Sequence, residues 1–90
     1  MSWRLEYSKR ARKQLEKLDP AQRKIILSWL DKHIFGCEDP RAHGKALTGR
    51  FAGQWRYRVG NYRILCEIDD GKLVVLALNV IHRSKAYRSK

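Results

Sequence analysis

The chain has 90 residues, enough for a single domain with one modest hydrophobic core. Twenty lysines and arginines against nine acidic residues give a formal net charge of +11. The hydrophobic fraction of 43% is ordinary for a globular protein, so disorder is not the default interpretation. Such an excess of positive charge is typical of proteins that bind nucleic acid or an acidic protein. No apolar stretch approaches the ~20 residues that a membrane span needs, so we expect no membrane partner.

The cysteines and the N-terminus indicate the compartment. Cys37 and Cys66 lack the paired spacing of a zinc site, and we interpret them as reduced thiols. The first residues lead directly into a strand pattern and have no signal-peptide features. We therefore expect a cytoplasmic protein without a metal or another cofactor.

The N-terminal part predicts one strand followed by two helices. Residues 3–7 alternate between apolar and polar side chains, as in a strand with one buried face. Ser8 is a candidate N-cap of the first helix, and Asp19-Pro20 predicts the start of the second, which ends near Gly36. Each helix carries one apolar stripe, formed by Ala11, Leu15 and Leu18 in the first and by Ile26, Leu30 and Ile34 in the second.

The C-terminal part predicts three strands. Residues 37–53 form a long irregular stretch, and strands are expected at 54–59, 62–69 and 72–80. Gly60-Asn61 and Asp70-Gly71 separate these strands and are typical of two-residue hairpin turns. The last strand is apolar on both faces and is therefore expected to be central, with the first strand on its free edge.

The predicted order of elements is β-α-α-β-β-β. This order defines an α+β fold in which a small antiparallel sheet has an N-terminal helical hairpin packed on one face. The whole chain, residues 1–90, is expected to form one domain, because it contains no repeat and no linker.

The first hairpin predicts a cluster of arginines. A two-residue turn at Gly60-Asn61 places Arg58 directly opposite Arg63, and Arg56 lies on the same face of the sheet. Like charges in that position destabilise a sheet, whereas guanidinium groups match phosphate oxygens in pairs. A solvated basic face is the alternative explanation, but the direct opposition favours a phosphate site.

A titratable group is expected beside this cluster. If Asp70-Gly71 is also a two-residue turn, His82 lies on the same face as Arg63, with Arg83 next to it and Tyr87 further along the tail. An imidazole beside phosphate-binding arginines suits general acid/base chemistry. We interpret His33 as a residue at the boundary of helix and core, and His43 as a loop residue.

The order of elements and three sequence runs carry a resemblance. Two of these runs are 55–64 (WRYRVGNYRI) and 81–87 (IHRSKAY), and the third comprises the segments 39–41 and 45–49 before the hairpin. Together they resemble the RelE/ParE superfamily of toxin-antitoxin toxins over essentially the whole chain. RelE-like members of this superfamily cleave mRNA in the A site of the 30S ribosomal subunit without a metal, whereas ParE-like members inhibit DNA gyrase.

The resemblance implies roles for individual residues. Arg56 and Arg58 match the paired basic positions of RelE-like toxins, Arg63 matches the arginine at the scissile phosphate, and Arg83 and Tyr87 match the C-terminal arginine and tyrosine. The family's type member has lysines at the paired positions, and an arginine stays protonated near neutral pH. We therefore assign proton transfer to His82.

These observations predict the toxin of a toxin-antitoxin module, an endoribonuclease that drives the 2′-hydroxyl of translated mRNA onto the adjacent phosphate. Lys45 and Arg50 are expected to bind RNA together with Arg56 and Arg58. The expected partners are the ribosome, mRNA and an acidic, RelB-like antitoxin. Two alternatives are a ParE-like gyrase inhibitor without nuclease activity and an RNA-binding module without catalysis.

Overall fold

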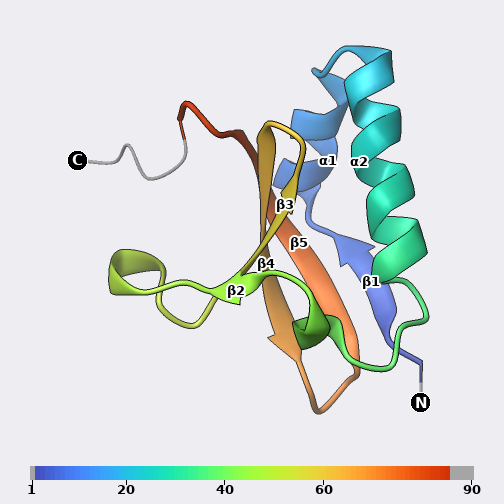
Figure 1. Ribbon diagram of the computed structural model, residues 1–90, viewed down its shortest axis with the longest axis vertical. Helices are drawn as coiled ribbons and strands as arrows, with labels where there is room; N and C mark the ends of the chain where they lie inside the picture. Colours follow the sequence, from blue (N-terminus) through green and yellow to red (C-terminus); the bar gives the residue numbers. More distant parts are fainter. Residues whose placement is uncertain (1, 86–90) are drawn as a thin grey trace.

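The computed structural model describes residues 2–85 (Figure 1). Its helices are α1 (Lys9–Glu16) and α2 (Pro20–His33), with short 3-10 helices η1 (Pro40–Ala42) and η2 (Gly49–Phe51). Its strands are β1 (Arg4–Tyr7), β2 (Lys45–Ala46), β3 (Trp55–Val59), β4 (Tyr62–Asp69) and β5 (Val74–His82). The predicted α+β order is confirmed, with one short strand added inside the irregular stretch.

The five strands form one sheet in the order β1-β5-β4-β3-β2. β1 pairs with the free edge of β5, as expected for an apolar central strand. This pairing is parallel, whereas all other pairs are antiparallel, so the expected antiparallel sheet is in fact mixed.

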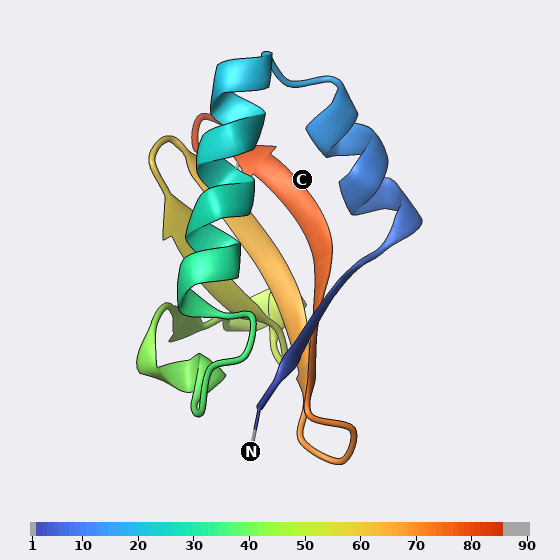
Figure 2. The ribbon, with the colours of Figure 1, turned by 90° about the vertical axis from the view of Figure 1, so that its right-hand side faces the viewer.

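Both helices cover the same face of the sheet (Figure 2). Ser8 caps α1 by accepting a hydrogen bond from the Ala11 N–H at 3.0 Å, and Asp19 caps α2 by accepting one from the Gln22 N–H at 3.3 Å. The buried helix residues pack on the sheet residues Tyr57, Val59, Ile64, Cys66, Val75, Ala77 and Val80. Within residues 2–85, neither α1 nor α2 lies on the other face of the sheet, which we call the uncovered face.

The segment before β3 is held close to that strand. The Trp55 indole donates to the His43 carbonyl at 2.7 Å, and the buried Tyr57 hydroxyl donates to the Pro40 carbonyl at 2.6 Å. Gly44 has a φ of 78°, and a Cβ atom there would overlap the Arg56 carbonyl oxygen. Only glycine allows this close approach, which positions β2 beside β3.

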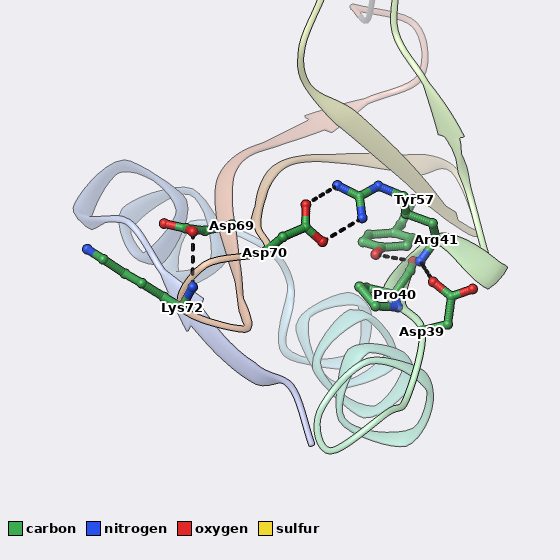
Figure 3. Close-up of polar contacts among 7 residues, drawn as sticks. All are labelled: Asp39, Pro40, Arg41, Tyr57, Asp69, Asp70 and Lys72. Carbon is green, nitrogen blue, oxygen red and sulfur yellow. Dashed lines mark hydrogen bonds and ion pairs between the residues drawn. The ribbon is translucent and has the colours of Figure 1, made fainter. Parts of the chain in front are cut away.

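The second hairpin differs from the prediction. Asp69 pairs with Val74, so four residues connect the strands instead of two. The Asp69 carboxylate accepts a hydrogen bond from the Lys72 N–H at 3.1 Å, and Leu73 has a φ of 55°. Arg41 forms two hydrogen bonds of 2.9 Å with the Asp70 carboxylate (Figure 3), and these contacts stabilise the longer turn.

A β-bulge between Leu65 and Cys66 shifts the pairing of β4 with β5 by one residue. The Gln14 side chain of α1 stabilises this region, because its Oε1 atom accepts a hydrogen bond from the Val80 N–H at 2.6 Å. β1 pairs with β5 only as far as Ala77, so Gln14 supplies a partner beyond the end of β1. The bulge decides which face of the sheet each residue at the end of β5 occupies.

Candidate nucleic-acid interface

Arg58 and Arg63 face each other across β3 and β4, as the sequence predicts. The turn between them has Gly60 at a φ of 58°, which fits a two-residue hairpin turn with glycine in its first central position. Arg56 is opposite Leu65 and shares the face of Arg58. Tyr57 and Val59, which alternate with Arg56 and Arg58 along β3, are buried under the helices. The three arginines therefore belong to the uncovered face.

Strand β2 adds a fourth cation to this face. Lys45 pairs directly with Arg56, so both side chains lie on the same side of the sheet. The sequence predicts Lys45 only as an RNA-binding loop residue, since a two-residue strand is too short to give a periodic pattern. We refer to Lys45, Arg56, Arg58 and Arg63 as the basic face.

Two arginines of the basic face, Arg58 and Arg63, are poorly neutralised by the described part of the chain. Within residues 2–85, neither Arg58 nor Arg63 forms an ion pair with a carboxylate; the ion pairs are Arg4 with Glu6 and Arg41 with Asp70. The Nε and Nη1 atoms of Arg63 are buried and have no hydrogen-bond partner. A guanidinium in this state is unfavourable until an anion accepts hydrogen bonds from its N–H groups, which is the behaviour of a phosphate site.

His82 does not lie on the basic face, and the expectation from the hairpin register is therefore wrong. The β4–β5 turn is two residues longer than predicted, and this change alone would leave each β5 residue on its predicted face. The one-residue bulge then reverses the face of every β5 residue that follows it. His82 consequently pairs with Tyr62, and Ile81 is the residue opposite Arg63. The His82 and Tyr62 rings make an edge-to-face contact with centroids 5.2 Å apart.

The contacts of His82 indicate the tautomer of its neutral ring. Nδ1 accepts a hydrogen bond from the Ser84 backbone N–H at 3.1 Å and lies 2.8 Å from the Ser84 hydroxyl. Because a backbone N–H only donates, Nδ1 is the lone-pair nitrogen, and Nε2 carries the proton in the neutral ring. His82 thus has a proton-accepting atom, situated at the end of β5.

Arg83 continues the pairing beyond β5. Its backbone N–H donates to the Asn61 carbonyl at 2.7 Å, which holds Arg83 beside the tip of the first hairpin. This places an additional cation at the end of the sheet where Arg58 and Arg63 lie. Tyr87 lies outside the described residues.

Arg50 flanks the basic face. It belongs to η2, is exposed, and has its guanidinium 5.9 Å from the centroid of the Phe51 ring. The connection that contains η2 and the segment after β5 both extend from the sheet on the side opposite the helices (Figure 1). Lys45 and Phe51 also line a hollow between β2 and η2.

The far end of the uncovered face is acidic, a feature that sequence reasoning missed. Glu6, Glu67 and Asp69 line one hollow there, together with Arg4 and Lys72. The uncovered face therefore carries Arg58 and Arg63 near the Gly60-Asn61 turn and a mixed group with three carboxylates near the Asp70 turn. The alternation of side chains along β4 could have predicted these carboxylates, since Glu67 and Asp69 lie on the same side of the strand as Arg63.

The remaining histidines and cysteines have structural surroundings. His33 stacks on Trp29 with ring centroids 4.5 Å apart, and His43 contacts His33 edge-to-face at 5.1 Å. Both cysteines are free thiols, and burial raises the pKa of Cys66. In the described residues no three histidine, cysteine or acidic side chains gather as a potential metal site, and no helix is long and apolar enough to cross a membrane.

The fold and the basic face define a class of small α+β toxins, and comparisons with known proteins agree. The family model described as "ParE toxin of type II toxin-antitoxin system, parDE" matches residues 5–87. Toxin RelG of Mycobacterium tuberculosis is 36% identical over 90 residues, covering 98% of this chain and 99% of that toxin.

Solved structures of toxins show the same fold. The toxin-antitoxin complex RelBE2 of Mycobacterium tuberculosis matches with a TM-score of 0.79 and 31% identity, covering 93% of this chain and 94% of the matched chain. The isolated E. coli RelE toxin matches with a TM-score of 0.72 and 25% identity, covering 99% and 89%. This chain belongs to the RelE/ParE superfamily and is a toxin of a type II toxin-antitoxin system.

Proposed function

We propose that this toxin is a ribosome-dependent, metal-independent endoribonuclease that cleaves mRNA in the ribosomal A site. The observation that carries this proposal is the direct opposition of Arg58 and Arg63, with two buried Arg63 nitrogens that lack a partner. A bound phosphodiester relieves both the repulsion between the guanidinium groups and the missing hydrogen bonds.

The reaction follows from this site. The 2′-oxygen of the substrate forms a bond with the adjacent phosphorus, and the bond from phosphorus to the 5′-oxygen breaks. Arg63, assisted by Arg56 and Arg58, stabilises the charge that develops on the non-bridging oxygens. The products are a 2′,3′-cyclic phosphate and a 5′-hydroxyl, so RNA is required.

His82 is assigned to take the proton of the 2′-hydroxyl. Its Nδ1 atom is the lone-pair nitrogen, and the Ser84 hydroxyl, 2.8 Å from Nδ1, is assigned as a relay between substrate and imidazole. His82 is the last residue of β5, where it can approach a substrate around the end of the sheet. Arg83 contributes a cation, and Tyr87 is assigned to stack on an unpaired base.

Binding to the ribosome is assigned to Lys45, Arg50 and the basic side chains of α1, which suit ribosomal RNA. The solved relatives include the toxin-antitoxin complex RelBE2 from Mycobacterium tuberculosis. A cognate acidic antitoxin is the corresponding partner of this chain, as its charge of +11 suggests. The site of action is the cytoplasm, where translating ribosomes are found.

Primer extension on translated mRNA tests this function. Discrete cuts that require the ribosome are expected from the natural chain, and Arg63→Ala should reduce their rate by at least about 100-fold. Undiminished cleavage by Arg63→Ala contradicts the assignment.

The ParE family match favours gyrase inhibition as the second candidate. Loss of gyrase supercoiling without RNA cleavage would support that candidate instead.

A further inference from the structure

We propose that Lys45 is the general acid that protonates the leaving 5′-oxygen, a role that rests on the proposed nuclease function. Lys45 is exposed and lies directly opposite Arg56 on the uncovered face. It is also a diagonal neighbour of Arg58, and such neighbours are about 7–8 Å apart, within reach of long side chains. A phosphate bound by the arginines is therefore accessible to the Lys45 amine.

The position of Lys45 is fixed from both sides. On one side, Gly44 approaches the Arg56 carbonyl as only glycine can, and the Trp55 indole holds the His43 carbonyl at 2.7 Å. On the other side, the Leu47 N–H donates to the Gln54 carbonyl at 3.0 Å. These contacts fix the backbone on both sides of Lys45, and a fixed backbone suits a group that must meet a reacting atom.

The chemistry of the neighbouring groups leaves this role to Lys45. Arg56, Arg58 and Arg63 bind phosphate but retain their protons near neutral pH, whereas a lysine ammonium can transfer one. His82 lies on the opposite face and is assigned to the 2′-hydroxyl. Glu67 shares the uncovered face but lies four residues along β4 from Arg63, a separation of about 13 Å.

The proposed step balances without a further reactant. As the 2′-oxygen attacks phosphorus, its proton passes to His82. As the bond to the 5′-oxygen breaks, that oxygen takes the electron pair of the bond and a proton from the Lys45 ammonium. The uncharged Lys45 and the protonated His82 then exchange protons with water, which restores the starting state.

A substrate with sulfur in place of the bridging 5′-oxygen separates acid catalysis from phosphate binding. A thiolate leaves without protonation, so loss of a general acid affects the normal mRNA and leaves the sulfur substrate unaffected. Lys45→Arg keeps the charge but not a transferable proton. We expect this variant to cleave normal mRNA on programmed ribosomes about 100-fold more slowly than the natural chain. On the sulfur-substituted mRNA the two proteins should differ by less than about fivefold.

Lys72→Arg is the matched control. Lys72 lies in the β4–β5 connection at the acidic end of the same face, so this variant should cleave both substrates at the natural rate. Equal losses with both substrates would show that Lys45 only binds phosphate, and no loss with either would remove it from the reaction. A natural chain that cleaves neither substrate overturns the proposed function itself, a result distinct from these two.

Discussion

Arg41 and Asp70 form a two-pronged ion pair that joins η1 to the β4–β5 turn, with both N–O distances at 2.9 Å (Figure 3). Arg41 is next to Pro40, whose carbonyl accepts the Tyr57 hydroxyl. The two contacts hold the connection before β2 against the sheet from two directions, and β2 carries Lys45. The geometry of the basic face thus depends on contacts at the opposite end of the sheet.

We expect the Arg41–Asp70 pair to contribute stability that acid removes. The Arg41 guanidinium lowers the pKa of Asp70, so the folded state favours the ionised carboxylate. The stabilisation is present above the unfolded pKa of an aspartate, about 3.9, and is lost as the pH falls through the lower folded value. Thermal melts from pH 2 to 7 should show Asp70→Asn slightly less stable at pH 7 and equal to the natural chain at the acidic end.

Arg58→Gln should stabilise the protein while it weakens catalysis. The substitution removes the like charge opposite Arg63 and should raise the free energy of unfolding by about 0.2–1 kcal/mol. Denaturant titration at low and high salt measures this gain, which should shrink as salt screens the repulsion. Arg12→Gln on the exposed side of α1 has the same effect on net charge, and an equal gain there would assign the effect to overall charge.

Gly44→Ala should destabilise the protein and displace β2. Left-handed backbone costs a residue with a Cβ atom about 1–2 kcal/mol, and at Gly44 the overlap with the Arg56 carbonyl adds to that cost. Gly36→Ala is the control, because Gly36 has a similar φ of 75° with open space around it. Calorimetry should give a larger loss for Gly44→Ala, and similar losses would contradict the packing of residues 40–46 on β3.

Two tyrosines with buried hydroxyl groups should differ in their response to loss of that group. Tyr57→Phe removes the hydrogen bond to the Pro40 carbonyl and should cost about 1–2 kcal/mol of folding free energy. The Tyr7 hydroxyl is buried without a partner in the described residues, so Tyr7→Phe should be neutral or stabilising. Urea unfolding of the two variants measures the contrast, and a stable Tyr57→Phe protein would show that the Pro40 contact is unimportant.

Tyr7 and Tyr57 should also lower the stability of the folded protein at alkaline pH. Burial raises the pKa of Tyr7 to about 12 and also raises the pKa of Tyr57. Folding therefore favours the protonated phenols, and their contribution is complete below the unfolded tyrosine pKa of about 10 and is lost as the pH rises above it. Stability measured from pH 8 to 12 should fall less steeply in either phenylalanine variant than in the natural chain.

The sequence by itself determined the elements whose signals are local. Ser8 and Asp19 begin the two helices because a side-chain oxygen followed by an apolar stripe satisfies the free N–H groups of the first turn. Gly60-Asn61 specifies the first hairpin, because glycine allows the backbone conformation that the turn requires. With that turn fixed, strand alternation is sufficient to place Arg56, Arg58 and Arg63 on one face.

Tertiary structure decided the positions of Lys45 and His82. Lys45 joins the basic face because contacts of Trp55 and Gly44 bring its segment against β3. These contacts join parts of the chain that no local sequence pattern connects. His82 changes face because α1, through Gln14, stabilises the bulged end of β5. Side chains alternate with a period of two, so one inserted residue reverses every later position, and no local sequence signal records where that residue is inserted.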